Sequence, residues 1–373
     1  MPQEYYFSPV RKYSKLSGLF LNKDVSKYES MISVAIMCYF YIFVVCKILV
    51  FFEDVGVSNN MQDIVVFFVF TNVIPHSTII RLKRLDLVEL MRMAEEIYVC
   101  ESDALNAFYE KMNKQAALVQ KLVCPFGIGV VVLAFLMWFV TGNEDPLPFG
   151  LMPSWAMSYS LIGCAFWEVL TSLFLSHEYT ICMGIKLCVL VHLYEHFTHL
   201  KAEIQSLDED CRERRSDSHY LQNRLASISR YHASIRALAQ KADATFNLCL
   251  LSIYLNWSIF ICTCLLRIGY IQLFSGEFWY LVIYLSAGCS LLFGDCFSTQ
   301  RVINESETVG DACYQIDSVG CDLQFQKSLT MVIKEGQEPV VFTIEKFGNF
   351  SVGSIQIILK ASFSYYTFLR SFS

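Results

Sequence analysis

The chain has 373 residues, of which 54% are hydrophobic and 17% are charged, whereas a soluble globular protein carries about 25% charged residues. Its mean hydropathy is +0.42, and the uncharged residues gather in long runs, which is typical of an integral membrane protein. The formal net charge of −6 leaves no basic patch to neutralise phosphate groups, which argues against a nucleic-acid partner.

Seven apolar runs follow one another along the chain, and each is long enough to cross a bilayer as a helix. The first begins only after 30 residues and is too long for the apolar region of a signal peptide. We therefore predict an all-α integral membrane protein with seven transmembrane helices, at residues 31–52, 64–80, 122–141, 156–180, 245–271, 278–295 and 347–369.

The basic residues are distributed very unevenly between the connections. Alternate segments, at residues 1–30, 81–121, 181–244 and 296–346, hold 25 of the 29 lysines and arginines, and the three other connections hold none. Basic residues favour the cytosolic side, so we predict a cytosolic amino terminus and an extracellular carboxyl terminus. This orientation is the reverse of that of a G-protein-coupled receptor.

The predicted cytosolic segments carry apolar residues at helical spacing. The fourth span continues through Leu193, Phe197, Leu200 and Ile204, and residues 220–244 run into the fifth span without a breaker. Residues 301–333 show a similar pattern, and a charged loop is expected at 208–218. These stripes must be buried against one another, so we predict a cytosolic helical anchor bundle.

The resulting organisation has six parts along the chain. They are a cytosolic segment (1–30), transmembrane helices 1 to 4 (31–180), cytosolic helical extensions (181–244), transmembrane helices 5 and 6 (245–295), a cytosolic anchor helix (296–346), and a pore-lining seventh helix with a short extracellular tail (347–373).

One face of the last span is polar at its inner end and aromatic at its outer end. Residues placed on this face by steps of three or four are Gln356, Lys360, Ser364, Phe368, Ser371 and Phe372. Such a stripe fits a pore lining with a hydrophobic constriction, and the alternative is packing between helices. Lys360 would oppose cation passage unless its side chain snorkels to the interface or finds a carboxylate, for which Glu168 is one candidate.

The end of the chain resembles the carboxyl-terminal signature of insect odorant receptors. Residues 358–369 read Ile-Leu-Lys-Ala-Ser-Phe-Ser-Tyr-Tyr-Thr-Phe-Leu, which contains the Lys-x-Ser-x-Ser-Tyr core of that family. Two further patches agree, at residues 145–149 and 312–314. The related gustatory receptors end with a Thr-Tyr and a Gln-Phe pair, and serine replaces threonine and glutamine at the same spacing here, which disfavours that branch.

The resemblance implies a ligand-gated, non-selective channel for monovalent and divalent cations, built as a heterotetramer around one pore. The connection between spans four and five lacks the long insertion of the family's shared co-receptor, so the chain resembles a tuning subunit that works with the odorant co-receptor. The resemblance also implies the plasma membrane of olfactory sensory neuron dendrites as its location, and a small volatile as its ligand.

The pocket for such a volatile is expected in the outer half of the bundle and should be apolar and aromatic. The candidate side chains share helical faces of four spans, and the alternative for each is ordinary helix packing. They are Phe68, Asn72, Ala134, Phe135, Trp138, Tyr159, Ile162, Phe166, Tyr280, Ile283 and Tyr284.

Other classes of membrane protein fit less well. The sequence has no HExxH, GxSxG or glycine-rich phosphate loop, so we expect neither an enzyme nor a cofactor or metal. The outer connections contain no cysteine for a disulfide, which again disfavours a G-protein-coupled receptor. A gustatory-type channel and a secondary transporter stay open as alternatives, although no internal repeat supports a transporter.

Overall fold

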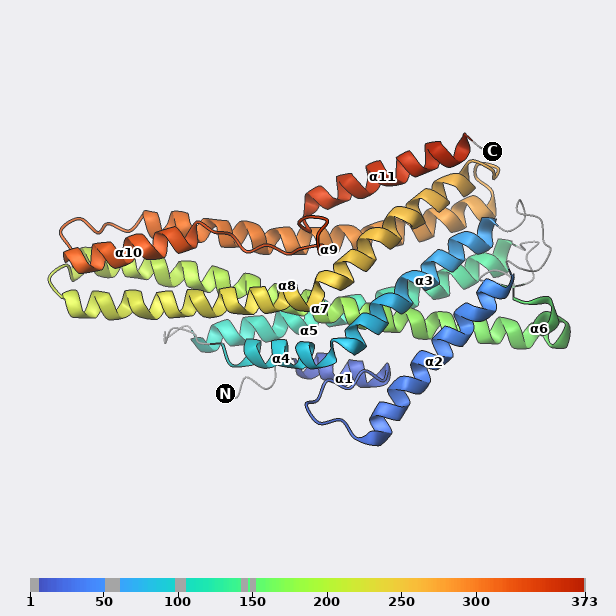
Figure 1. The fold of residues 1–373 in the computed structure, drawn as a ribbon, viewed down its shortest axis with the longest axis horizontal. Helices are drawn as coiled ribbons and strands as arrows, with labels where there is room; N and C mark the ends of the chain where they lie inside the picture. Colours follow the sequence, from blue (N-terminus) through green and yellow to red (C-terminus); the bar gives the residue numbers. More distant parts are fainter. Residues whose placement is uncertain (1–6, 51–60, 98–104, 142–146, 148–151, 372–373) are drawn as a thin grey trace.

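The computed structural model describes residues 7–50, 61–97, 105–141, 147 and 152–371, and within these ranges it is almost entirely helical (Figure 1). The helices are α1 (Ser8–Leu16), α2 (Lys27–Val50), α3 (Met61–Leu82), α4 (Arg84–Glu95), α5 (Leu105–Thr141), α6 (Ser154–Tyr159), α7 (Leu161–Glu213), α8 (Ser218–Ile268), α9 (Gly276–Tyr314), α10 (Leu323–Gly336) and α11 (Val352–Arg370). Among the described residues, β pairing is limited to one bridge between Thr343 and Asn349. The all-α fold class is confirmed.

The seven predicted spans fall largely within α2, α3, α5, α7, α8, α9 and α11. Five of the described helices are long and apolar enough to cross a membrane by length and composition, namely α2, α5, α7, α8 and α9. Helix α3 packs beside them against α8 and α7, and α11 packs against α8 and α9. Helix α11 is less apolar than these five because it carries the polar stripe.

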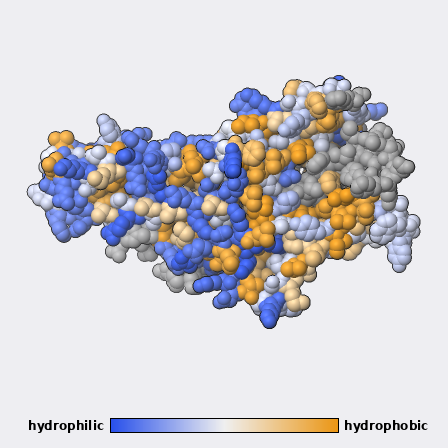
Figure 2. All heavy atoms as spheres, in the orientation of Figure 1, coloured by the Kyte–Doolittle hydropathy of each residue, from blue (hydrophilic) through white to orange (hydrophobic). Residues whose placement is uncertain are grey.

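The molecule is elongated and has an apolar half and a polar half. Helix α7 has 53 residues, which is about 80 Å at 1.5 Å per residue, whereas the hydrocarbon core of a bilayer is about 30 Å thick. Helices α7, α8 and α9 therefore extend from the apolar half, which holds the predicted spans, into the polar half, which holds α1, α4, α10 and residues 181–244 (Figure 1). Hydrophobic residues gather on the first half and hydrophilic residues on the second (Figure 2).

Two predicted boundaries on α7 are wrong. The fourth span was expected to begin at residue 156, but the short α6 ends at Tyr159 and α7 begins at Leu161, with Ser160 as its N-cap. The Ser160 side chain accepts a hydrogen bond from the Gly163 backbone N–H at 3.0 Å. At the other end α7 continues to Glu213, through much of the expected loop. Leu207 and Cys211 lie one helical turn apart among the charged residues, and both are buried, which keeps this segment helical.

The apolar stripes of the polar half are buried, as predicted. Leu193, Phe197 and Leu200 of α7 are fully buried. Leu225 and Ile228 of α8 are also buried, and α7 packs against α8. The helical pattern expected at 301–333 is interrupted, since α9 ends at Tyr314 and α10 begins at 323. The Asp322 side chain caps α10 by accepting a hydrogen bond from the Gln324 N–H at 3.0 Å.

Buried histidines lie within this polar half. His192, His196 and His232 are at most 2% exposed, and His196 Nδ1 lies 2.7 Å from the hydroxyl of Tyr231. Burial lowers the pKa of His192 to about 3 and that of His232 to about 4, because a charged imidazolium loses its hydration there. These imidazoles are therefore neutral at physiological pH.

Candidate functional site

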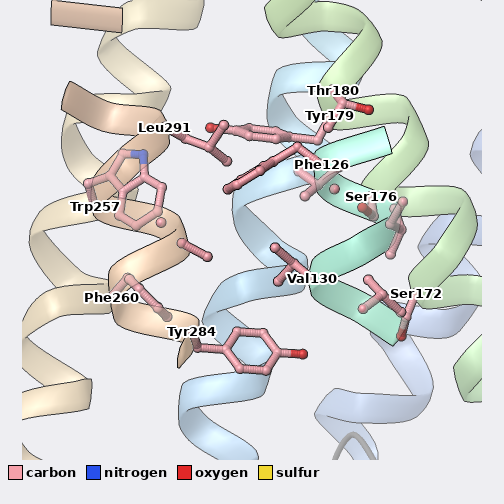
Figure 3. A pocket seen from close by; sticks show the side chains of 16 residues that line it. Phe126, Val130, Ser172, Ser176, Tyr179, Thr180, Trp257, Phe260, Tyr284 and Leu291 are labelled. Carbon is pink, nitrogen blue, oxygen red and sulfur yellow. The ribbon is translucent and has the colours of Figure 1, made fainter. Parts of the chain in front are cut away.

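The apolar half contains a cavity of about 130 Å³ between α3, α5, α7, α8 and α9 (Figure 3). An engineered apolar cavity of about 150 Å³ holds benzene, so this space suits one small organic molecule. Most lining side chains are apolar or aromatic, and they include Phe126, Val130, Val131, Leu175, Tyr179, Trp257, Phe260, Tyr284 and Leu291.

Two glycines allow the helices around the cavity to approach closely. A Cβ atom on Gly288 of α9 would collide with the indole ring of Trp257 on α8. A Cβ atom on Gly127 of α5 would collide with the Ser176 and Thr180 side chains of α7 in the same way. The Trp257 ring is also held edge-on against Phe260, at 5.2 Å between ring centroids. Parts of the cavity wall are therefore side chains packed directly on glycine backbone, namely the Trp257 ring on Gly288 and the Ser176 and Thr180 side chains on Gly127.

A few polar groups interrupt the apolar lining. The Ser172 hydroxyl is buried and has no hydrogen-bond partner among the described residues. The Tyr179 hydroxyl and the Trp257 indole nitrogen are also buried, and they lie close enough to interact with each other. Figure 3 shows the Tyr179 hydroxyl pointing across the cavity on the side of Trp257. Because an indole N–H can only donate, the Tyr179 O–H still has no acceptor among the described residues. A buried polar group without a partner is costly, so a ligand that offers an acceptor to Tyr179 would stabilise this site.

The predicted ligand contacts are scattered relative to this cavity. Tyr284 lines it. Ala134 is buried, and Phe135, Trp138 and Ile283 are half-buried, but the cavity lining does not include them. The side chains of Phe68, Asn72 and Tyr280 lie outside the described residues.

Three predicted contacts lie on the outer surface of the chain. Tyr159 is 93% exposed, Ile162 is 86% exposed and Phe166 is 69% exposed. The face of α7 that reaches the cavity is instead that of Ser172, Ser176 and Tyr179, which are nearer the polar half. The cavity thus lies nearer the polar half than the pocket that the sequence predicted in the outer half of the bundle.

Sequence reasoning missed Tyr179, Trp257 and Phe260. Tyrosine and tryptophan within a span combine an apolar ring with a polar atom that needs a partner, and this feature marks both Tyr179 and Trp257. The small residues Gly127 and Gly288 are a second signal, because small residues in membrane helices permit close helix approach. Both signals are visible in the sequence, but neither shows which helices meet.

The polar face of α11 is directed away from the rest of the chain. Helix α11 buries Ser354, Ile355, Ile358 and Ser362, and the Ser362 hydroxyl donates a hydrogen bond to the Ser258 carbonyl of α8 at 2.9 Å. The predicted stripe residues Gln356, Lys360, Ser364, Phe368 and Ser371 are all exposed, and Phe372 lies outside the described residues. Packing between helices of one chain therefore does not account for the stripe.

The suggested pairing of Lys360 with Glu168 is wrong. Glu168 on α7 is fully buried and forms an ion pair with Lys47 on α2, because α2 packs against α7, whereas α11 packs against α8 and α9. Lys360 also lies nearer the inner end than expected, since α11 begins at Val352 and places Lys360 about 12 Å along the helix.

Two further ion pairs join neighbouring helices to α7, on the side of the cavity that is nearer the polar half. Arg81 of α3 pairs with Glu178, which precedes the cavity residue Tyr179. Lys186 donates a hydrogen bond to Asp295 of α9 at 2.5 Å, and both side chains are at most 4% exposed. Breaking such a pair leaves an uncompensated buried charge, so these contacts hold α3, α7 and α9 in fixed relative positions.

The fold is similar to a solved insect receptor. The structure of the insect olfactory receptor OR5 from Machilis hrabei superposes with a TM-score of 0.79 at 13% sequence identity, over 98% of this chain and 97% of that chain. The structure of the same receptor in complex with eugenol gives a TM-score of 0.80 at 13% identity, over 99% and 98% of the two chains.

Comparison of sequences gives relatives in Drosophila melanogaster. The relative named "Putative odorant receptor 85d" is 29% identical over 50% of this chain and 44% of its own length. Odorant receptor 13a is 29% identical over 40% of this chain and 38% of its own length, so the chain matches less than half the length of each relative. The family described as 7tm Odorant receptor matches residues 56–363. The chain therefore belongs to the 7tm odorant receptor family.

Proposed function

We propose that the chain is the tuning subunit of a heterotetrameric, ligand-gated, non-selective cation channel that it forms with the odorant co-receptor. A small volatile binds in the cavity between α3, α5, α7, α8 and α9 and opens a pore lined by α11. The observation that carries this proposal is the coexistence, in one chain, of an apolar cavity and a separate helix with an exposed polar face.

The chemistry of the cavity supports a ligand that is mostly apolar and carries one polar group. Aromatic rings surround most of the space, and Tyr179 and Trp257 supply the polar atoms. Eugenol, which is bound by the similar Machilis receptor, has this combination of an aromatic ring and a hydroxyl group. The ligand of this chain belongs to the same size and polarity class.

The exposed face of α11 supports the pore. In an assembly of four subunits, a polar stripe can face water only if it lines a common axis or a water-filled cavity. Gln356 and Ser364 then face the conduction path, and Lys360, about 12 Å along the helix, extends its ammonium group toward the inner mouth, where it does not oppose cation passage. Phe368, which is exposed, and Phe372 form the outer constriction, which gates by dewetting, and Ser371 lies on the same side of the helix.

The proposed orientation has the amino terminus and the polar half in the cytosol, in the plasma membrane of sensory neuron dendrites. It is supported by the 25 basic residues on one side of the spans. An epitope tag at the carboxyl terminus tests it directly. Staining of unpermeabilised cells is expected, and staining only after permeabilisation would refute the orientation.

Whole-cell current in a cell line without endogenous receptors tests the function. We expect an inward cation current within a fraction of a second of applying a volatile from a broad panel, only when the chain and the co-receptor are both present, and without G-protein input. No current despite surface expression of both subunits would refute the tuning-subunit proposal. Uptake of a solute without ionic current would instead favour the transporter alternative, whereas the family match speaks against the gustatory branch.

A further inference from the structure

A second, larger cavity lies where the apolar half meets the polar half, between α2, α3 and the segment that joins α1 to α2. Its volume is about 710 Å³. Helices α2 and α3 diverge toward the first residues of α2, and the joining segment closes the wider end (Figure 1). The cavity thus has a polar end at residues 23–30 and an apolar flank along α2.

We propose that this cavity binds one amino-phospholipid of the phosphatidylethanolamine class. Its phosphate lies against Lys23 and Arg84, its ammonium group against Asp24 and Glu29, and one acyl chain lies along α2. The lipid belongs to the cytosolic leaflet in the orientation proposed above, and its binding does not depend on odorant recognition or on the pore.

Two basic side chains lie at the polar end of the cavity, one held by hydrogen bonds and the other exposed. Arg84 lines the cavity, and its Nη1 donates hydrogen bonds to the backbone carbonyl groups of Phe20 and Asn22. These bonds fix the guanidinium at the cavity wall, and its five N–H groups allow further bonds to a phosphate. Lys23 is exposed at the same rim. A third cation, Arg81, is already paired with Glu178 and contributes to the wall.

The acidic side chains select the class of headgroup. Asp24 and Glu29 line the same cavity as Lys23 and Arg84, so a purely anionic headgroup would meet repulsion as well as attraction. A headgroup with both a phosphate and a primary ammonium matches both signs of charge. Choline is less suitable because its quaternary nitrogen has no N–H group to donate to a carboxylate.

The apolar flank provides a path for an acyl chain. Val34, Cys38 and Tyr41 of α2 line the cavity at spacings of four and three residues, and they therefore share one helix face. Val34 is 59% exposed, Tyr41 is 47% exposed, and Leu82 on the opposite wall is 80% exposed. An exposed apolar flank continuous with a charged rim is the surface expected of a phospholipid site at a membrane interface.

Native mass spectrometry of the delipidated full-length receptor tests the proposal. The receptor is titrated separately with phosphatidylethanolamine, phosphatidylglycerol and phosphatidylcholine of identical acyl chains. We expect phosphatidylethanolamine to be retained about fivefold better than the other two, which is the effect of about one additional charge contact at a membrane surface.

Four variants assign that retention to the cavity. Lys23→Gln should lower the binding of all three phospholipids, Asp24→Asn should remove the preference for phosphatidylethanolamine over phosphatidylcholine, and Val34→Trp should block the acyl path. Lys27→Gln is the matched control, because Lys27 is exposed in the same segment and does not line the cavity. All four residues are exposed or half-exposed, so the fold should tolerate the changes.

Three results would overturn the proposal. They are equal retention of the three phospholipids by the unaltered receptor, a preference for phosphatidylglycerol, and an equal effect of Lys27→Gln and Lys23→Gln. Because the readout is lipid retention and not current, these results are independent of whether the channel proposal holds.

Discussion

Gly288 and Trp257 determine one wall of the proposed ligand cavity through a contact that leaves no room for a methyl group. We expect Gly288→Ala to push the indole ring into the cavity and to weaken ligand response about tenfold or more, since overpacking typically costs about 1–3 kcal/mol. Dose–response curves of ligand-evoked current measure the effect. Gly294→Ala is the control on the same helix, because a Cβ there meets no atom within 4 Å. An equal loss in both variants would contradict this role.

The Tyr179 hydroxyl is the polar group best placed to distinguish between ligands. Tyr179→Phe keeps the ring and removes the hydroxyl, so we expect about fivefold lower potency for ligands with a hydrogen-bonding group, from the loss of about 1 kcal/mol. Potency for pure hydrocarbons should be unchanged. Tyr270→Phe, at a surface position, is the control. A uniform loss for all ligands would indicate a packing role instead.

Helix α11 exposes its polar face while its opposite face packs on α8 and α9, which places the proposed pore lining apart from the cavity. We expect Phe368→Ala to raise ligand-free conductance, since the constriction loses an apolar ring. Phe363→Ala is the control, because Phe363 is also exposed but is not on the polar stripe. It lies about 100° around the helix from Ser364, which shares the stripe with Phe368. Unchanged leak at normal surface expression would remove Phe368 from the gate.

The ion pair between Lys186 and Asp295 joins α7 to α9 just below the cavity. Lys186→Met or Asp295→Leu alone should destabilise the receptor by about 3–5 kcal/mol, because each leaves a buried charge without a counter-ion. The double variant should recover most of that loss. Thermal unfolding of purified protein measures the cycle, and additive losses would show that the two side chains act independently.

On the scale of the whole molecule, buried histidines make the polar half sensitive to acid. The pKa of His232 is about 4 in the folded chain and about 6.5 in an unfolded chain. The unfolded chain therefore binds more protons between these values, and stability is complete above pH 6.5 and falls as the pH is lowered. His192, with a pKa of about 3, acts in the same direction.

We accordingly expect the midpoint temperature of thermal unfolding to decrease when the pH is lowered from 7.5 to 5.5. The His232→Phe variant should make that decrease smaller by about 2 °C. The exposed His219 supplies the control variant His219→Phe. A midpoint that is independent of pH in the unaltered receptor would contradict the burial of these imidazoles in the neutral form.

The sequence by itself determined the elements that depend on local hydropathy and helical periodicity. The seven spans, the continuation of α7 and α8 beyond the apolar half, and the polar face of α11 follow from the spacing of residues such as Leu193, Phe197 and Lys360. The carboxyl-terminal pattern also indicated the odorant receptor family, which the family match confirms.

Only the tertiary structure decided where the cavity lies and which charges pair. Tyr159, Ile162 and Phe166 share a helix face that was plausible for a pocket, yet they are exposed, and Glu168 pairs with Lys47 and not with Lys360. Helical periodicity specifies which residues share a face. It does not specify which face meets which neighbour, because that depends on contacts between distant residues such as Gly288 and Trp257.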